Sequence, residues 1–450
     1  MERVGGEQQG ESTSIAQVAL ASFIGTTVEW YDFFLYGTAA ALVFGPLFFP
    51  GDDPLTGILL SLGTFAVGFV ARPVGGAVFG HYGDKIGRKS MLVLTLLMMG
   101  LATFAIGLLP TYESVGVLAP ILLVVLRIIQ GFALGGEWGG AVLMAVEHSP
   151  PGRRGFYGSW PQTGAFAGLL ISTGVLAAFS SLPEEQFLAW GWRVPFLLSI
   201  VLVGVGLFIR LKIAESPAFA QVKESHTEAG MPIVDVLRTY PKQVLVAMGA
   251  RYAENGVFYV LVVFVLDYAT RELGMSRNSV LPAVLVGAAV GFFAVLIAGH
   301  LSDRLGRRAV YLFGAAFSLL FAFPFFWLVD TQSPVIIALA ITVGLAIGHA
   351  PMYGPQGAFF SELFGTRVRY SGASLGYQLA SVLAGGLSPL IAVALLASFG
   401  YWAVALYIIF MCVVTLVAII IATETNQLDI AADQAQEREL IQDSPEPNVR

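Results

Sequence analysis

The decapeptide "GHYGDKIGRK" at residues 80–89 recurs as "GHLSDRLGRR" at residues 299–308, and five of the ten positions are identical. The two copies lie 219 residues apart, one in each half of the chain. Each copy ends a long apolar stretch, which is the second such stretch of its half. A match at the same place in both halves predicts an internal structural repeat.

The sequence around the two copies is strongly apolar. Of its 450 residues, 56% are hydrophobic and 12% are charged, whereas soluble proteins carry about 25% charged residues. A helix needs about 20 mostly apolar residues to cross a bilayer. The segments that meet this requirement are 17–46, 55–82, 90–110, 114–147, 155–180, 190–212, 242–268, 278–301, 309–329, 333–361, 370–398 and 400–422. Such continuous runs exclude the short alternating strands of a membrane barrel.

These segments predict an all-α integral membrane protein with twelve transmembrane helices in two six-helix pseudo-symmetric bundles. The longest polar interval separates the sixth segment from the seventh. The predicted parts are a cytoplasmic N-terminal tail (1–16), an N-terminal bundle (17–212), a cytoplasmic linker (213–241), a C-terminal bundle (242–422) and an acidic cytoplasmic tail (423–450).

Lysine and arginine are distributed unequally between the two sets of connecting segments. One set carries 15 of them, and the other carries only Arg193, Arg271 and Arg277. Because cytoplasmic loops are enriched in these residues, we expect the first set and both termini in the cytoplasm. This orientation suits a multi-pass protein of the plasma membrane, here a bacterial inner membrane. The net charge of −6 gives no reason to expect a nucleic-acid partner.

The repeated decapeptide resembles the signature loop of the major facilitator superfamily, G-x-x-x-D-x-x-G-R-[KR]. The stretches "VEWYDFFLYG", "RIIQGFALGGEWGGA" and "GSWPQTGAFAG" are similar to its metabolite:proton symporter branch, whose members take up shikimate, 2-oxoglutarate, citrate, proline or glycine betaine. The resemblance implies a central cavity lined mainly by the first, fourth, seventh and tenth spans. It also implies gating by Asp84 with Arg88 and by Asp303 with Arg307. The alternative is that these arginines only set the membrane orientation.

Two carboxylates, Glu29 and Asp32, lie in the apolar first span. A charge at the bilayer centre costs at least ~2.5–3.5 kcal/mol, so such residues are candidate functional groups. Residues three apart lie about 60° apart around a helix, and both can point into one cavity. Nearby carboxylates in a poorly solvated place favour the uptake of a proton. We expect Glu29, Asp32 and Glu137 to couple proton movement, the alternative being a structural ion pair with an arginine.

The other polar residues of the spans are candidates for substrate binding. They are Arg72, Arg127, Gln130, Gln162, Glu254, Asn255, Tyr259, Tyr353, Gln356, Tyr377 and Gln378. Arg72 can equally be the permanent counter-ion of a buried carboxylate. Arg251 lies near the predicted cytoplasmic end of its span, where an arginine can snorkel to water. His349 is more typical of a packing residue than of a proton relay.

Together these features favour a secondary active transporter that couples proton entry to uptake of a small organic acid or zwitterion by alternating access, acting as a monomer. No cofactor or metal is expected, because the proton gradient drives transport and the sequence has no ATP-binding motif or His-rich cluster. It has no nucleophile–base pair of an enzyme. Two alternatives are a proton antiporter that exports a small molecule and a transport-fold metabolite sensor.

Overall fold

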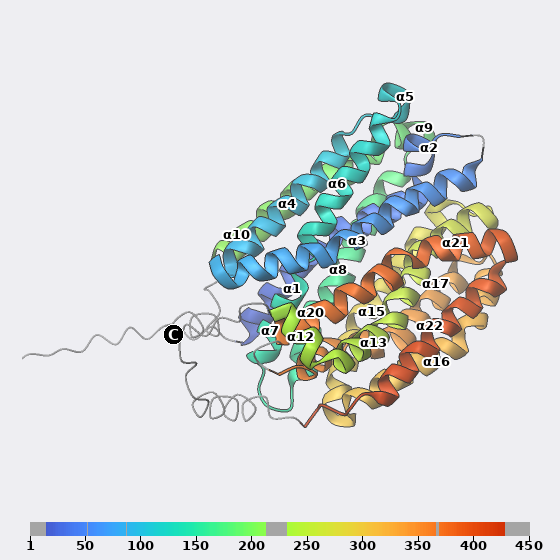
Figure 1. The fold of residues 1–450 in the computed structure, drawn as a ribbon. Helices are drawn as coiled ribbons and strands as arrows, with labels where there is room; N and C mark the ends of the chain where they lie inside the picture. Colours follow the sequence, from blue (N-terminus) through green and yellow to red (C-terminus); the bar gives the residue numbers. More distant parts are fainter. Residues whose placement is uncertain (1–14, 52, 87, 213–231, 366–368, 428–450) are drawn as a thin grey trace, which may run out of the picture.

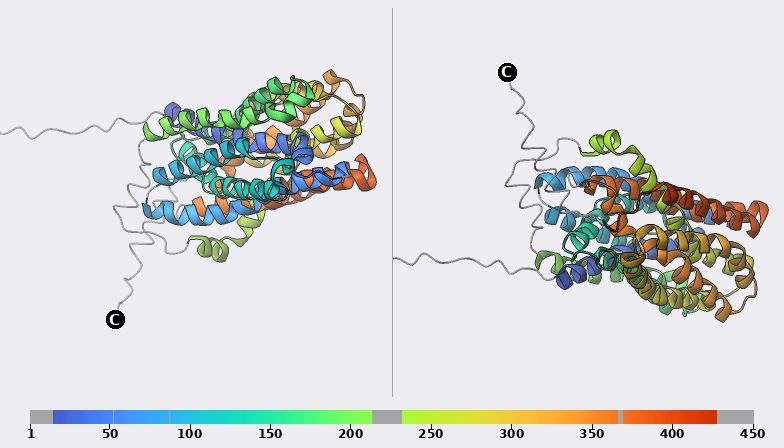
Figure 2. Two further views of the ribbon diagram at one scale, coloured as in Figure 1. Left: turned by 90° about the horizontal axis from the view of Figure 1, so that it is seen from above. Right: turned by 90° about the horizontal axis from the view of Figure 1, so that it is seen from below.

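The structure is a computed structural model that describes residues 15–51, 53–86, 88–212, 232–365 and 369–427. The regular structure of these residues is entirely helical. Figure 1 shows the helices of the first half, in blue to green, beside those of the second half, in yellow to red. The two views of Figure 2 show the same long helices along one common direction, as in a membrane-spanning bundle.

The described residues of the first half form six long helical rods. They are α1 (Ile15–Leu42), α3 (Pro54–Ile86), α4 (Arg88–Leu108), α6 (Leu118–Leu134) continued by α7 (Trp138–Glu147), α8 (Arg154–Ser180) and α10 (Arg193–Lys212). Short helices connect some of them, namely α2 (Phe44–Phe48), α5 (Tyr112–Val115), α9 (Glu184–Gln186) and the π-helical η1 (Phe187–Gly191). Figure 1 places α2, α5 and α9 at one end of the bundle.

The second half also contains six rods, preceded by α12 (Pro232–Thr239). The seventh rod is α13 (Pro241–Tyr259), η2 (Val260–Phe264), α14 (Val265–Asp267) and η3 (Tyr268–Glu272). It is followed by α15 (Arg277–Leu305) and α16 (Arg307–Val329). The tenth rod is α17 (Pro334–Val343), η4 (Gly344–His349), α18 (Ala350–Tyr353) and α19 (Gln356–Glu362). The last two are α20 (Arg369–Ala380) with η5 (Ser381–Gly386) and α21 (Ser388–Phe399), then α22 (Tyr401–Ile421).

Most of the rods are both long and apolar enough to cross a membrane. Among the described residues, nine helices meet the length and hydropathy requirements of a span, or ten when the bent pair Glu184–Gly191 and Arg193–Phe208 counts as one. The remaining two rods are α1 and α4, of 28 and 21 residues. At about 1.5 Å per residue, 21 residues already cover the hydrocarbon core of about 30 Å. Each of the twelve predicted segments falls on one rod.

The two halves touch most closely where α8 crosses α15. A Cβ atom on Gly155 would lie 2.4 Å from the backbone oxygen of Gly299, and a Cβ on Gly299 would lie 2.6 Å from that of Gly155. Only glycine allows the two backbones to approach so closely. We call this end of the bundle, where α8 begins and α15 ends, the motif end. The end that carries α2, α5 and α9 is the opposite end.

Candidate functional site

A buried arginine of α13 is the centre of a polar network in the second half. Arg251 is 1% exposed. Its Nη1 donates hydrogen bonds to Glu254 Oε2 at 2.6 Å and to Gln356 Oε1 at 2.9 Å. Its Nε donates to Ser381 Oγ at 3.0 Å, and its guanidinium carbon lies 3.3 Å from the ring centre of Tyr377. The expectation that Arg251 snorkels to water is therefore wrong in this structure.

Glu254 is satisfied by three partners from three different segments. Besides Arg251, Gln356 Nε2 donates to its Oε2 at 3.0 Å, and His349 Nε2 lies 3.0 Å from its Oε1. Gln356 also donates to the Tyr311 hydroxyl at 3.0 Å. A buried carboxylate without partners would be costly, so the network explains how Glu254 is accommodated. Nδ1 of His349 has no hydrogen-bond partner among the described residues.

This network faces a small cavity between the halves. Its lining residues are Trp30, Phe34 and Ala165 of the first half and Arg251, Glu254, Asn255, Phe258, Tyr259, His349 and Tyr353 of the second. The empty volume is about 230 Å³, open solvent included, but the cavity as a whole has room for only about one water molecule. A metabolite therefore needs the cavity to widen. Of the predicted substrate residues, Glu254, Asn255, Tyr259 and Tyr353 line it.

Two arginines of the first half are buried among aromatic rings. The guanidinium carbon of Arg72 lies 4.1 Å from the ring centres of both Phe33 and Phe69. That of Arg127 lies 4.2 Å from the rings of Phe33 and Tyr36. In both arginines, Nε and Nη2 lack a hydrogen-bond partner within the described part of the chain. Arg72 also interacts electrostatically with Glu29, so its two predicted roles both stay open.

Asp32 does not line the described cavity. Trp30 and Phe34 do, and at about 100° per residue Asp32 lies on the other side of α1. There its side chain lies beside the Thr103 hydroxyl of α4, which donates to the backbone oxygen of Met99 at 3.0 Å. Gln130 donates to the same hydroxyl at 2.7 Å and accepts from Arg127 Nη1 at 3.2 Å. Asp32 is thus linked to Arg127 through two neutral side chains.

The polar residues predicted on the fourth span lie on either side of a short break between α6 and α7. Arg127 and Gln130 lie on α6, which ends at Leu134, whereas Glu137 precedes α7. The intervening glycines allow the break, because a Cβ on Gly135 would lie 2.0 Å from the backbone oxygen of Arg72. Glu137 is 3% exposed. Glu29 is likewise buried, at 4%, so both carboxylates lie inside the protein as predicted proton sites must.

Three further predicted substrate residues hold the halves together near the motif end. Gln162 accepts from Trp138 Nε1 at 3.1 Å and donates to the backbone oxygen of Tyr353 at 3.4 Å. Tyr377 stacks on Trp138 with ring centres 3.7 Å apart. Gln378 donates to the backbone oxygen of Gly135 at 3.2 Å. In this state these side chains bind the other half of the protein and do not line the cavity.

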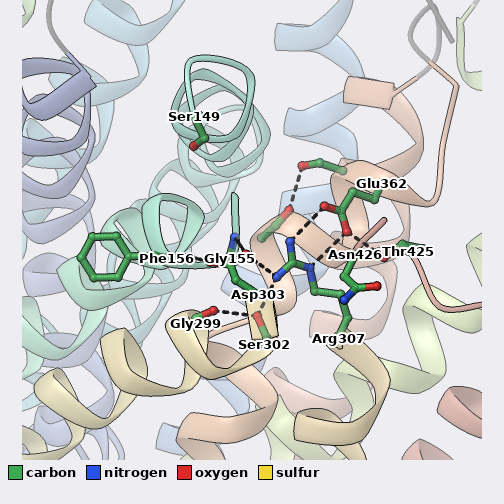
Figure 3. Close-up of polar contacts among 12 residues, drawn as sticks. Ser149, Gly155, Phe156, Gly299, Ser302, Asp303, Arg307, Glu362, Thr425 and Asn426 are labelled. Carbon is green, nitrogen blue, oxygen red and sulfur yellow. Dashed lines mark hydrogen bonds and ion pairs between the residues drawn. The ribbon is translucent and has the colours of Figure 1, made fainter. Parts of the chain in front are cut away.

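The second copy of the repeated decapeptide joins the halves directly (Figure 3). Asp303 Oδ1 and Oδ2 accept hydrogen bonds from the backbone nitrogens of Gly155 and Phe156, at 2.8 and 2.9 Å. These nitrogens belong to the N-terminal turn of α8, where a negative charge is favoured. Arg307 Nη1 donates to Asp303 Oδ1 at 2.7 Å. The side chains of Asp84 and Arg88 lie outside the described residues.

Arg307 also binds groups that the sequence analysis missed. Its Nε and Nη2 donate to the two carboxylate oxygens of Glu362, at 3.2 and 3.1 Å, and Figure 3 shows Arg307 between Asp303 and Glu362. The Thr425 hydroxyl donates to Glu362 Oε2 at 2.7 Å. Glu424 accepts from the backbone nitrogens of Arg307 and Arg308 at 2.8 and 3.0 Å. The available signal was an acid, Glu362, at the end of an apolar span.

The halves are also connected at the opposite end. Arg277 Nη2 lies 2.9 Å from Glu184 Oε2, and Ser180 donates to Asn278 Oδ1 at 3.1 Å. Each contact joins the end of α8 or the start of α9 to the start of α15. With contacts across both ends, the cavity is occluded. In the described part of the chain, no three His, Cys, Asp or Glu side chains are placed to hold a metal ion.

Comparison with known proteins agrees with this architecture. The family model described as "Major Facilitator Superfamily" matches residues 22–385. The chain is 43% identical to a shikimate transporter of Escherichia coli K12, over 91% of this chain and 95% of that protein. It is 34% identical to the proline/betaine transporter of the same strain, over 83% of this chain and 76% of that protein.

A solved structure of the proton:xylose symporter XylE superposes with a TM-score of 0.73 at 17% identity, covering 95% of this chain and 100% of that one. At this identity the likeness supports the fold alone. The chain is therefore a multi-pass integral membrane transporter and not an enzyme. By its repeated loop, its two six-rod halves and its relatives, the protein belongs to the major facilitator superfamily.

Proposed function

We propose that the protein imports a small carboxylate-bearing metabolite together with a proton, by alternating access and as a monomer. The observation that carries the proposal is the buried Arg251–Glu254–His349 network facing a cavity enclosed between the halves. Ionisable groups inside a membrane protein mark substrate and proton pathways. Here an acid, an imidazole and an arginine meet where a substrate between the halves would bind.

The relatives support the substrate class. Shikimate, proline and glycine betaine, the compounds in their names, all carry a carboxylate. They differ elsewhere, since shikimate is an anion and the other two are zwitterions. A buried arginine that holds a carboxylate suits all three, so we assign the class and leave the individual compound to experiment.

Alternating access would work through the contacts at the two ends. The motif end would open when Asp303 leaves the N-terminal turn of α8. The opposite end would open when Arg277 leaves Glu184. We place the motif end in the cytoplasm, because the cation-rich connecting segments lie there. The occluded arrangement then corresponds to a state between outward-open and inward-open forms.

The proton gradient would supply the driving force. Each proton entering the cell gains about 2.3 kcal/mol per 100 mV of membrane potential. Glu29, Asp32 and Glu137 stay our candidate coupling carboxylates in the first half. Of these, Asp32 lies near Arg127 with Thr103 and Gln130 between them, and Glu29 interacts electrostatically with Arg72.

Uptake by proteoliposomes tests the proposal. The purified protein is supplied with labelled shikimate, proline and glycine betaine, with and without an inward proton gradient. We expect gradient-driven accumulation of one of them. Gradient-driven loss of a preloaded compound would instead support an antiporter, and saturable binding without transport would support a sensor. Either result overturns proton-coupled uptake.

A further inference from the structure

We propose that Arg251 binds the substrate carboxylate, and that Glu254 occupies this position until it takes up the transported proton. The inference rests on the proposed function and deepens it, because it names the side chain that binds the substrate carboxylate and the protonation that couples this binding to proton movement. Glu254 would thus be a coupling residue, in addition to the carboxylates predicted in the first half.

Arg251 is held in place by neutral partners even without Glu254. Ser381 fixes Nε and Gln356 fixes Nη1, both within 3.0 Å. The Tyr377 ring packs against the guanidinium plane at 3.3 Å. Because these three partners are neutral, they orient the guanidinium but leave its charge uncompensated. Arg251 therefore stays a preformed anion site whenever Glu254 withdraws.

Glu254 and a substrate carboxylate compete for the guanidinium of Arg251. Both Arg251 and Glu254 line the cavity, and Glu254 Oε2 lies 2.6 Å from Arg251 Nη1. Two ionised carboxylates on one guanidinium repel each other, and the repulsion is stronger in a poorly solvated site than in water. Protonation makes Glu254 neutral and removes this repulsion. Proton and substrate anion then bind together, which is the requirement of symport.

His349 offers a route by which a proton can reach Glu254. His349 Nε2 lies 3.0 Å from Glu254 Oε1, the oxygen that does not contact Arg251. The imidazole can pass its Nε2 proton to Oε1 while Nδ1 takes one proton from water that enters an opened cavity. One proton enters and one reaches the carboxylate, so the step is balanced. Nδ1 has no partner among the described residues and is open for this exchange.

The other titratable groups near Glu254 do not change charge in the same range. They are Arg251 on the same helix, Tyr311 on α16, Tyr353 on α18 and Tyr377 on α20. Arg72 of α3 and Tyr259 of α13 interact with Arg251. Phenols and guanidinium groups in general lose their protons near pH 10 and above pH 12. The exchange is therefore assigned to the carboxylate and the imidazole.

The central test is Glu254→Gln in proteoliposomes, with labelled shikimate and labelled glycine betaine as probes. Gln has the size of Glu and the neutrality of its protonated form. We expect gradient-free exchange of the transported probe to persist, with gradient-driven accumulation reduced at least tenfold. The matched control is Asp267→Asn, because Asp267 lies on the same rod but pairs with Arg271 outside the network. The control should keep both activities.

Measuring the Kd of the probes as a function of pH tests the proposal on the wild-type protein, even if the Gln variant is unstable. In the wild-type protein the Kd for the bound probe should rise up to tenfold per pH unit once Glu254 is ionised, and the Gln variant should bind independently of pH. Methyl shikimate, which lacks the anionic carboxylate, should bind at least tenfold more weakly than shikimate. Arg251→Lys should weaken shikimate or betaine binding by a similar factor.

The failures of the two proposals are distinguishable. If the wild-type protein accumulates a probe and Glu254→Gln does so equally, the proposed function stands and the assignment to Glu254 is wrong. If the wild-type protein accumulates neither probe, proton-coupled uptake of these compounds fails. In that case pH-independent wild-type binding would also overturn the competition between Glu254 and substrate, whereas a pH-dependent Kd would support it.

Discussion

Replacing Asp303 by Asn should shift the protein toward a form that is open at the motif end. Asp303 accepts two backbone hydrogen bonds from the other half and one from Arg307. Asn keeps the size and one acceptor oxygen, but it loses the charge and turns an NH₂ group toward a backbone N–H. Arg307 stays paired with Glu362. The change therefore acts mainly on the contact between the halves.

The magnitude follows from the geometry. The Asp303 side chain is 4% exposed, so solvent screens it little. A hydrogen bond to a charged group contributes about 1.5–3 kcal/mol, and one of the two inter-half bonds is lost. Because that bond exists only while the motif end is closed, the closed form loses about 2 kcal/mol relative to the open one. At about 1.4 kcal/mol per tenfold, the open fraction should rise roughly thirtyfold.

Cysteine labelling can measure this shift. Ser159 is buried in α8, and its side chain faces Gly299 of the other half, so a Ser159→Cys side chain is reached only when the motif end opens. The single native cysteine, Cys412, is buried and gives a low background. In the Ser159→Cys background, we expect Asp303→Asn to increase the rate of reaction with a membrane-impermeant maleimide about thirtyfold.

The control is Asp330→Asn. Asp330 accepts a hydrogen bond from Tyr268 of the same half and makes no contact across the halves at the motif end. In the Ser159→Cys background, the Asp330→Asn variant should be labelled at a rate within about twofold of the parent, because no hydrogen bond between the halves changes. If the Asp303→Asn variant were labelled at the rate of the parent, the hydrogen bonds of Asp303 to α8 would not set the equilibrium between the closed and open forms.

Three further changes test other parts of the structure. Gly155→Ala should speed the same labelling, because the new Cβ would lie 2.4 Å from the Gly299 oxygen, whereas Gly174→Ala on the same helix has no neighbour nearer than 3.8 Å and should be neutral. Asp32→Asn should abolish gradient-driven accumulation and spare some exchange; accumulation at the wild-type level would remove Asp32 from the coupling site. Glu424→Ala should lower the free energy of unfolding in detergent by roughly 0.5–1 kcal/mol, and with it the midpoint of thermal unfolding, because it removes acceptors at the N-terminus of α16; an unchanged midpoint would contradict this capping role.

Much of the fold could be predicted because it depends on local composition. Apolar length marked the twelve rods, and the repeated decapeptide marked the two halves. The break between α6 and α7 was harder, because it depends on how Gly135 packs against Arg72 of α3. A run of glycines shows that a break is possible, but the partner helix decides where it occurs.

The buried charges were found from sequence, but their partners were not. An ionisable residue in an apolar span is visible as such, and Arg72, Arg127 and Glu254 all lie inside the protein. Arg251 was misjudged because depth was counted from the end of the span. It lies ten residues into α13, which corresponds to about 15 Å, too deep for easy access to water. Its partner Gln356 is 105 positions away in sequence, a separation that no local pattern encodes.

The two halves contain related arrangements of acid, glutamine and arginine that differ in one respect. In the second half, Glu254 contacts Arg251 directly and both bind Gln356. In the first half, Thr103 and Gln130 separate Asp32 from Arg127. Electrostatic interaction falls with distance, so a proton on Glu254 changes the anion affinity of its arginine more than a proton on Asp32 does. Glu254→Gln should therefore alter substrate affinity and its pH dependence, whereas Asp32→Asn should act chiefly on accumulation.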